Sequence, residues 1–193
     1  PQVLEEAVLI GSRWNFTPLP PAGSLELRSF LMMEYLCGLS SVMLKDYQTA
    51  VSCFSELPDS LLARENLSLI IPSTRFYEGW SRYRQGSYKA AYASLAEVAA
   101  GNSDLALRAA YLAGWCSYLT GEYPGAEQHF LSYSLAAKQP ESDKGRLMYA
   151  KSLQAQKKYA DAGAAYSSLY IGTAPSPYGD DALFEHAGLL AAT

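Results

Sequence analysis

Apolar and small residues recur at fixed intervals along the chain. A tyrosine is followed three residues later by an alanine, and four residues after that by a large apolar residue. The pattern occurs in four places: Tyr47, Ala50, Phe54; Tyr88, Ala91, Leu95; Tyr123, Ala126, Phe130; and Tyr159, Ala162, Tyr166. The tyrosines are 41, 35 and 36 residues apart. Spacings of this length are typical of helical repeat proteins.

A residue with almost no side chain lies twelve residues before each of these alanines: Gly38, Gly79, Gly114 and Ala150. Small residues at one fixed separation allow two antiparallel helices to cross closely. A larger side chain at either position would push the helix axes beyond the usual distance of about 8–10 Å. A short turn lies between the two small residues in every copy. Each unit is therefore predicted to be a helix, a tight turn and a second helix.

The predicted turns carry residues that suit helix ends. Gly86 and Gly121 fit the left-handed position at a helix C-terminus. Pro124 fits the first turn of the following helix, where its missing N–H costs little. The four turns read Lys45-Asp46, Gln85-Gly86-Ser87, Thr120-Gly121-Glu122 and Lys157-Lys158.

Polar residues upstream predict where the first helix of each unit begins. The expected caps and ends are Ser24 with Leu44, Ser73 with Gln85, Ser103 or Asp104 with Leu119, and Ser142 or Asp143 with Gln156. The segment from Tyr178 to Asp181 is expected to open a fifth first helix, with Gly188 in the small-residue position. The second helix of that repeat is missing, as expected of a fragment cut from a longer chain.

These motifs resemble the tetratricopeptide (TPR) repeat family, whose consensus has a small residue at the eighth position, a turn tyrosine, alanine at the twentieth position and an aromatic residue at the twenty-fourth. The match covers roughly residues 25 to 193. The resemblance implies an all-α fold: a right-handed superhelical solenoid of antiparallel helix pairs, with four full repeats and the first helix of a fifth. The consensus aromatic at the fourth position is present only as Phe184; the other repeats have Glu34, Arg75, Ala110 and Arg146 there.

The predicted repeat domain spans residues 24–193. Its repeats are expected at about 31–58, 73–101, 107–138, 143–173 and, in part, 180–193. Residues 58–72 are an insertion that lengthens the first spacing; an extra helical segment is expected from Leu61 to Leu69, ended by Pro72. Residues 1–23 lie outside the pattern. They are expected to be a linker, the end of a preceding unit, or an arm that packs Trp14 and Phe16 onto the repeats.

First helices line the concave surface of TPR solenoids, and the resemblance implies a partner-binding groove there. Two aromatic stripes at three- and four-residue steps stand at the family's groove positions, and each occupies one helix face. The predicted groove residues are Phe76, Trp80, Tyr83, Arg84, Arg108, Tyr111, Trp115, Tyr118 and Lys151, with Lys144 as a further cation at the rim. Aromatic side chains of this kind anchor protein interfaces. Two alternatives stay open: the rings belong to the core, or the N-terminal arm covers them.

Composition narrows the function classes. The net charge is −4 and the fifteen basic residues are dispersed, which disfavours nucleic-acid binding. No run of eighteen apolar residues exists, so no transmembrane segment is predicted. The three cysteines, Cys37, Cys53 and Cys116, are odd in number and form no CxxC motif. This disfavours a disulfide scaffold or a zinc site, and they are expected to be buried thiols.

Catalytic chemistry is disfavoured. His129 and His186 are the only histidines, and the sequence has no Gly-rich phosphate loop, GxSxG or HExxH motif. No cofactor or metal is predicted. The Lys and Asn residues with which chaperone-adaptor TPR domains hold a C-terminal carboxylate are absent from the corresponding positions. The expected function is a non-enzymatic scaffold that binds a protein or peptide segment in its groove. The alternatives are a small-ligand or glycan-binding module and a self-association module.

The segment from Ser176 to Phe184 resembles the inter-repeat segment of bacterial envelope TPR proteins. These include outer-membrane assembly lipoproteins and the periplasmic partners of the Tol–Pal system. The resemblance implies part of a larger bacterial protein located in the periplasm or associated with the envelope. A cytoplasmic location is the alternative.

Overall fold

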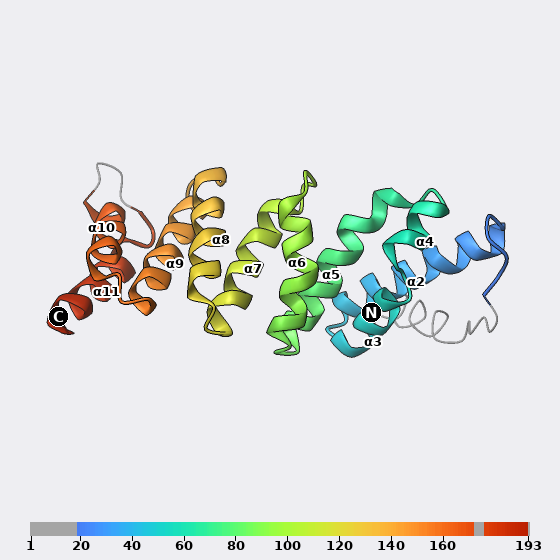
Figure 1. Cartoon of the computed structure of the whole chain (residues 1–193), viewed down its shortest axis with the longest axis horizontal. Helices are drawn as coiled ribbons and strands as arrows, with labels where there is room; N and C mark the ends of the chain where they lie inside the picture. Colours follow the sequence, from blue (N-terminus) through green and yellow to red (C-terminus); the bar gives the residue numbers. More distant parts are fainter. Residues whose placement is uncertain (1–18, 172–175, 193) are drawn as a thin grey trace. The chain divides into compact units, whose positions relative to one another are not determined.

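A computed structural model describes residues 19–171 and 176–192, and all regular structure within these ranges is helical (Figure 1). The contacts divide the chain into two compact units, residues 1–98 (unit 1) and 99–193 (unit 2). The elements are α2 (Leu25–Met43), α3 (Tyr47–Ser55), α4 (Asp59–Arg64), the 3-10 helix η1 (Ser68–Ile70), α5 (Ile71–Arg84), α6 (Tyr88–Ala100), α7 (Ala106–Leu119), α8 (Tyr123–Ala136), α9 (Glu141–Ala155), α10 (Tyr159–Tyr170) and α11 (Gly179–Ala192). The all-α prediction is confirmed for these residues.

The same backbone turn joins the two helices of each predicted pair. At the end of α7, Gly121 has a φ of 81°, its N–H donates to the Tyr118 carbonyl (3.1 Å), and the Glu122 N–H donates to the Ser117 carbonyl (2.8 Å). These two bonds define a Schellman motif, which satisfies the last carbonyls of a helix. The equivalent bonds and a positive φ occur at Lys45, Gly86 and Lys157. The left-handed role predicted for Gly86 and Gly121 is therefore confirmed.

The small residues make room for a large side chain of the next helix. A Cβ atom added to Gly38 would lie 2.6 Å from the Phe54 ring, and one added to Gly114 would lie 2.8 Å from the Phe130 ring. A Cβ on Gly79 would lie 2.7 Å from Leu95. The large residue follows its glycine by 16 positions in all three pairs. We call this contact the glycine seat, and it fixes the register between the paired helices.

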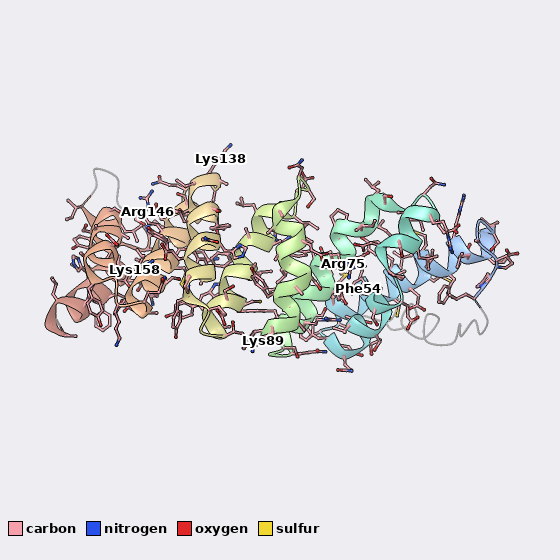
Figure 2. All side chains as sticks on the ribbon, viewed as in Figure 1. Phe54, Arg75, Lys89, Lys138, Arg146 and Lys158 are labelled. Atoms are coloured by element: carbon pink, nitrogen blue, oxygen red, sulfur yellow. The ribbon has the colours of Figure 1, made fainter. Side chains whose placement is uncertain are left out.

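In unit 1, α3 packs against both α2 and α5. The core consists of Leu27, Phe30, Leu31, Ala50, Phe54, Leu57 and Leu62. A buried carboxylate secures the start of α2, since Glu65 is 1% exposed, accepts hydrogen bonds from the Gly23 N–H and pairs with Arg28 and Arg64. An ion pair holds the insertion in place in the same way. Arg75 of α5, labelled in Figure 2, pairs with Asp59 of α4 at 3.1 Å.

In unit 2, α7 to α11 follow one another, each packed against the next (Figure 1). One core cluster joins α9, α10 and α11 around Leu153, Tyr166 and Leu189. The other joins α8 and α9 through Ala126, Phe130 and Met148. The fourth pair has Ala150 in place of glycine. Its large residue, Tyr166, is fully buried and donates a hydrogen bond to Gln154 Oε1 (2.6 Å).

The helix starts are only partly as expected. Ser24 caps α2 as predicted, because its Oγ accepts from the Leu27 N–H at 3.0 Å. The other predicted caps are wrong. Helix α5 begins at Ile71, so Ser73 lies inside it, and its hydroxyl donates to the Ile70 carbonyl instead. Helices α7 and α9 follow Leu105 and Pro140 and have no side-chain cap bond. This places Ser103 and Asp104 before α7, and Ser142 and Asp143 inside α9.

The insertion contains α4 and η1, so an extra helical segment is present as predicted. The predicted end at Pro72 is wrong, because this proline lies in the first turn of α5, where its missing N–H leaves no hydrogen bond unmade. The predicted arm with Trp14 and Phe16 lies outside the described residues. The repeat boundaries stay a prediction.

The glycine seat makes a prediction about stability. Replacing Gly114 with Ala is expected to lower the free energy of unfolding by about 1–3 kcal/mol, because the new methyl group overlaps the Phe130 ring. Gly188→Ala is the matched control, since no atom lies within 4 Å of its added Cβ. That variant is expected to gain up to about 1 kcal/mol from helix propensity. Urea denaturation measures the free energy of unfolding of both variants. Equal gains in stability in the two variants would contradict the close contact between Gly114 and Phe130.

Candidate functional site

In unit 1, the predicted groove residues Trp80, Tyr83 and Arg84 belong to a partly exposed group of aromatic rings and one cation. The rings of Trp80 and Tyr83 stack with centroids 5.9 Å apart. The Arg84 guanidinium lies over both Trp80, at 5.4 Å, and Tyr47 of α3, at 4.8 Å. Tyr83 also meets Tyr88 at the start of α6, at 5.6 Å. These five residues are the unit 1 aromatic group. Trp80 and Tyr83 are half-buried, while Arg84 is exposed.

The prediction for Phe76 is wrong. This side chain is 1% exposed and its ring packs edge-on against Tyr77. A ring covered to this extent belongs to the core and has no surface for a partner. The position was expected to face the groove because it continues the helical spacing of Trp80 and Tyr83. Spacing alone does not reveal that the neighbouring elements close over this end of the stripe.

In unit 2, the stripe of α7 forms a connected chain of rings. Tyr111 meets Trp115 at 6.4 Å, and Trp115 meets Tyr118 at 6.0 Å. Tyr118 continues to Tyr123 of α8 at 5.5 Å. The inner faces rest on the core, since Trp115 lies 6.1 Å from the Phe130 ring. We call Tyr111, Trp115, Tyr118 and Tyr123 the unit 2 aromatic group.

All four rings of the unit 2 aromatic group are half-buried. Tyr111, Trp115 and Tyr118 pack against the core cluster of α8 and α9, and part of each ring remains accessible to solvent. Burial also raises the pKa of Tyr118, so its hydroxyl stays protonated and able to donate a hydrogen bond at neutral pH. A single wall joining the two aromatic groups stays a prediction, because they belong to different units.

The predicted cations differ in their surroundings. Arg108 is exposed on α7. The Lys144 ammonium lies 4.5 Å from the Tyr111 ring centroid and 3.7 Å from Glu141. Lys151 instead donates to Glu185 of α11 at 2.8 Å. Lys151 and Lys144 thus each have a carboxylate beside them, and their role as rim cations for a partner stays a prediction. Glu185, 34 residues from Lys151, is not recognisable from spacing as its ion-pair partner.

One buried polar cluster in unit 1 was not predicted. Glu34, Cys37 and Cys53 lie between α2 and α3, each less than 10% exposed. Burial raises the pKa of Glu34, the nearby charge of Glu56 raises it further, and the Cys53 thiol donates a hydrogen bond to it. The available signal was Glu34 itself, a carboxylate at a position where the TPR consensus has an aromatic residue.

The two histidines lie in different surroundings. His129 is half-buried on α8, and burial lowers its pKa. His186 Nδ1 lies 2.7 Å from the Tyr170 hydroxyl. The same ring borders an open pocket of about 400 Å³ between α10 and α11. Within residues 19–171 and 176–192, no group of three or more His, Cys, Asp or Glu is placed to hold a metal ion. None of the helices in these ranges has the length and apolarity to cross a membrane.

The burial of Glu34 predicts how stability depends on pH. Its pKa in the folded state lies above the ordinary value of 4.5, so the favourable contribution of the protonated group is complete below pH 4.5 and is lost as the pH rises through the folded pKa. Glu34→Gln, which never ionises, is therefore expected to raise the melting temperature at about pH 7 and to lose this advantage near about pH 4.

Thermal unfolding with a reductant present measures this difference. Glu26→Gln is the control, because Glu26 is an exposed carboxylate in the first turn of the same helix. It is expected to show no gain at neutral pH, since its charge favours the helix N-terminus. A Glu34→Gln advantage that does not change with pH would contradict the burial of a carboxylate at this position.

A scan against models of known protein families finds no match for this chain, and a search of curated proteins finds none either.

Proposed function

We propose that this chain is a TPR-like solenoid that acts as a non-enzymatic scaffold and holds a segment of another protein. The four Schellman turns and the glycine seats support a repeated helix-pair unit. The right-handed superhelix and the count of four and a half repeats are part of this proposal. Such solenoids bind partners along an extended surface formed by successive repeats.

The unit 2 aromatic group carries the proposal. Tyr and Trp dominate interface hot spots because they offer a large rigid surface together with a polar atom. Here the rings are already held by Phe130 and by one another. The side chains that a partner would contact have therefore already lost most of their conformational freedom. This reduces the entropic cost of association.

The charges beside these rings indicate the chemistry of the partner. Lys144 lies over Tyr111, and Arg84 lies over Trp80 in unit 1. Arg108 adds an exposed positive charge on α7. A segment that combines apolar or aromatic residues with Asp or Glu would complement the group in either unit by itself. We propose such a segment as the ligand, bound by a periplasmic or envelope-associated protein of which this chain is a part.

The test is retention of a partner from an extract of the source cells on immobilised protein. The unchanged chain is expected to retain a partner protein, and the double variant Trp115→Ala with Tyr118→Ala is expected to lose it. The loss is expected to exceed tenfold, because hot-spot truncations typically cost about 2 kcal/mol or more each. Retention is also expected to weaken as salt is added, since charged pairs at the rim are screened.

Leu131→Ala with Leu135→Ala is the matched control. Both leucines are exposed on α8, so this variant loses a similar apolar area outside the aromatic group. Circular dichroism establishes that both double variants are folded. If the folded aromatic variant retains the same proteins as the unchanged chain, the aromatic group is not the binding site.

A second candidate function, self-association, rests on α11. Its Leu183, Phe184 and Leu190 are 50%, 79% and 68% exposed. Leu183 and Leu190 lie on one face of the helix, and Phe184 lies about a quarter turn away, on the side of Gly188. Gly188 on the same helix has no atom within 4 Å of an added Cβ. The space beside Gly188 is therefore empty, whereas a large side chain fills the space beside Gly38, Gly79 and Gly114. A helix from a second copy could use this face.

Analytical ultracentrifugation over a range of concentrations tests self-association. The unchanged chain is expected to show a rising average mass with concentration, and Phe184→Asp with Leu190→Asp is expected to remain monomeric, because a buried unpaired charge opposes the contact. A monomer at all concentrations before any substitution excludes this candidate and leaves the first proposal intact.

A further inference from the structure

Two buried cysteines of unit 1 lie side by side. Cys37 on α2 is 2% exposed, and Cys53 on α3 is 6% exposed. Their Sγ atoms are 2.6 Å apart, although both are free thiols in the structure. This separation approaches the length of a disulfide bond, about 2.05 Å. Because the two sulfurs belong to consecutive helices, a bond between them would link the helices of the first pair.

The repeat geometry brings these residues together. Each cysteine directly precedes a member of the Gly38–Phe54 seat, so the two are also separated by 16 residues. The equivalent positions of the second pair are Glu78 and Ser94. There the Ser94 hydroxyl donates to Glu78 Oε2 at 3.2 Å. The same two positions thus bring side chains into direct contact in two separate helix pairs.

We propose that Cys37 and Cys53 are an oxidation site, at which exchange with a disulfide oxidant forms an intramolecular bond that staples α2 to α3. Glu34 serves the pair as its local proton acceptor. The proposal is independent of the binding function. Its setting would be an oxidising compartment, where disulfides form and persist.

The reaction balances with a low-molecular-weight disulfide such as oxidised glutathione. The Cys37 thiolate attacks one sulfur of the oxidant, forms a mixed disulfide and releases one thiolate. Cys53 then loses its proton to Glu34 and attacks the Cys37 sulfur, which releases the second thiolate. Two protein thiols are oxidised and one oxidant disulfide is reduced to two thiols. Because both sulfurs are buried, the first attack takes place during a local opening of the helix pair.

The surroundings assign the two roles. The contact between the two sulfurs lowers the pKa of Cys37, and the same contact and burial raise the pKa of Cys53. Cys37 is therefore the attacking thiolate, and Cys53 keeps its proton until the second step. Glu34 lies three residues before Cys37 on the same helix and accepts a hydrogen bond from Cys53. The other charged groups that act on these three residues are Glu56 of the segment after α3 and Asp46 at its start. The negative charges of Glu34 and Asp46 raise the pKa of the neighbouring thiols and oppose their ionisation. Glu34 can take up the Cys53 proton because burial raises its own pKa.

Cys116 is an internal control. It is fully buried on α7 in unit 2, where burial raises its pKa to about 12. Both other cysteines of the chain lie in unit 1. Cys116 is therefore expected to stay a thiol under conditions that oxidise the pair.

The experiment counts thiols in the full chain after incubation with oxidised and reduced glutathione, or with dithiothreitol. The protein is quenched in acid, unfolded and alkylated with iodoacetamide, and its intact mass is measured. Oxidised protein is expected to carry one alkyl group, on Cys116, and reduced protein to carry three. Peptide mapping is expected to show a Cys37–Cys53 link. Three alkyl groups after oxidation, or a glutathione adduct that never resolves, would overturn the proposal.

Substitutions sharpen the result. After oxidation, the Cys116→Ser variant should carry no alkyl group. The Cys37→Ser variant cannot form the link. When glutathione is left out, its Cys53 and Cys116 should therefore both be alkylated. If Cys37→Ser fails to fold, the unchanged chain and Cys116→Ser still decide the outcome. Glu34→Gln is expected to slow closure of the mixed disulfide and to flatten its rate as a function of pH. A rate profile identical to that of the unchanged chain would remove Glu34 from the mechanism.

Discussion

The contact between a glycine of one helix and a large side chain of the next determines most of this structure. At Gly38, Gly79 and Gly114 the space of a missing Cβ is filled by Phe54, Leu95 or Phe130. The contact sets how far apart the helices of a pair lie and which residues face each other. A Schellman turn of the same form joins the two helices within each of the four pairs. The neighbours of each seat then follow: Cys37 meets Cys53, and Glu78 meets Ser94.

The seat also explains why the aromatic groups are half-exposed. Phe130 fills the space beneath Gly114, so Tyr111 and Trp115, on the same helix, pack against its ring and stay half-buried. The core therefore holds the rings without covering them. Phe76 is an exception, because the elements around it bury its side chain almost completely. The proposed binding surface of unit 2 is thus a consequence of how its helix pair packs, with Lys144 over the Tyr111 ring; in unit 1, Arg84 lies over Trp80.

The fold class and the helix-pair organisation could be predicted because they depend on short-range spacing, such as twelve residues from Gly114 to Ala126. Helix starts were less predictable, since α5, α7 and α9 begin without the side-chain caps that the sequence suggested. The burial of Phe76, the pairing of Lys151 with Glu185 and the Glu34–Cys37–Cys53 cluster depend on tertiary contacts. Residue types at helical spacing identify a face of a helix, but neighbouring elements decide how much of that face remains exposed.

The central claim is that Gly114 and Phe130 are energetically coupled because one fills the space left by the other. A double-mutant cycle with Gly114→Ala and Phe130→Leu measures this coupling directly by urea denaturation. The cost of the alanine is predicted to fall when the ring is absent, giving a coupling energy of about 0.5–3 kcal/mol, the range for residues in contact. Additive effects within about 0.3 kcal/mol would contradict the glycine seat, and with it the account of register and ring exposure.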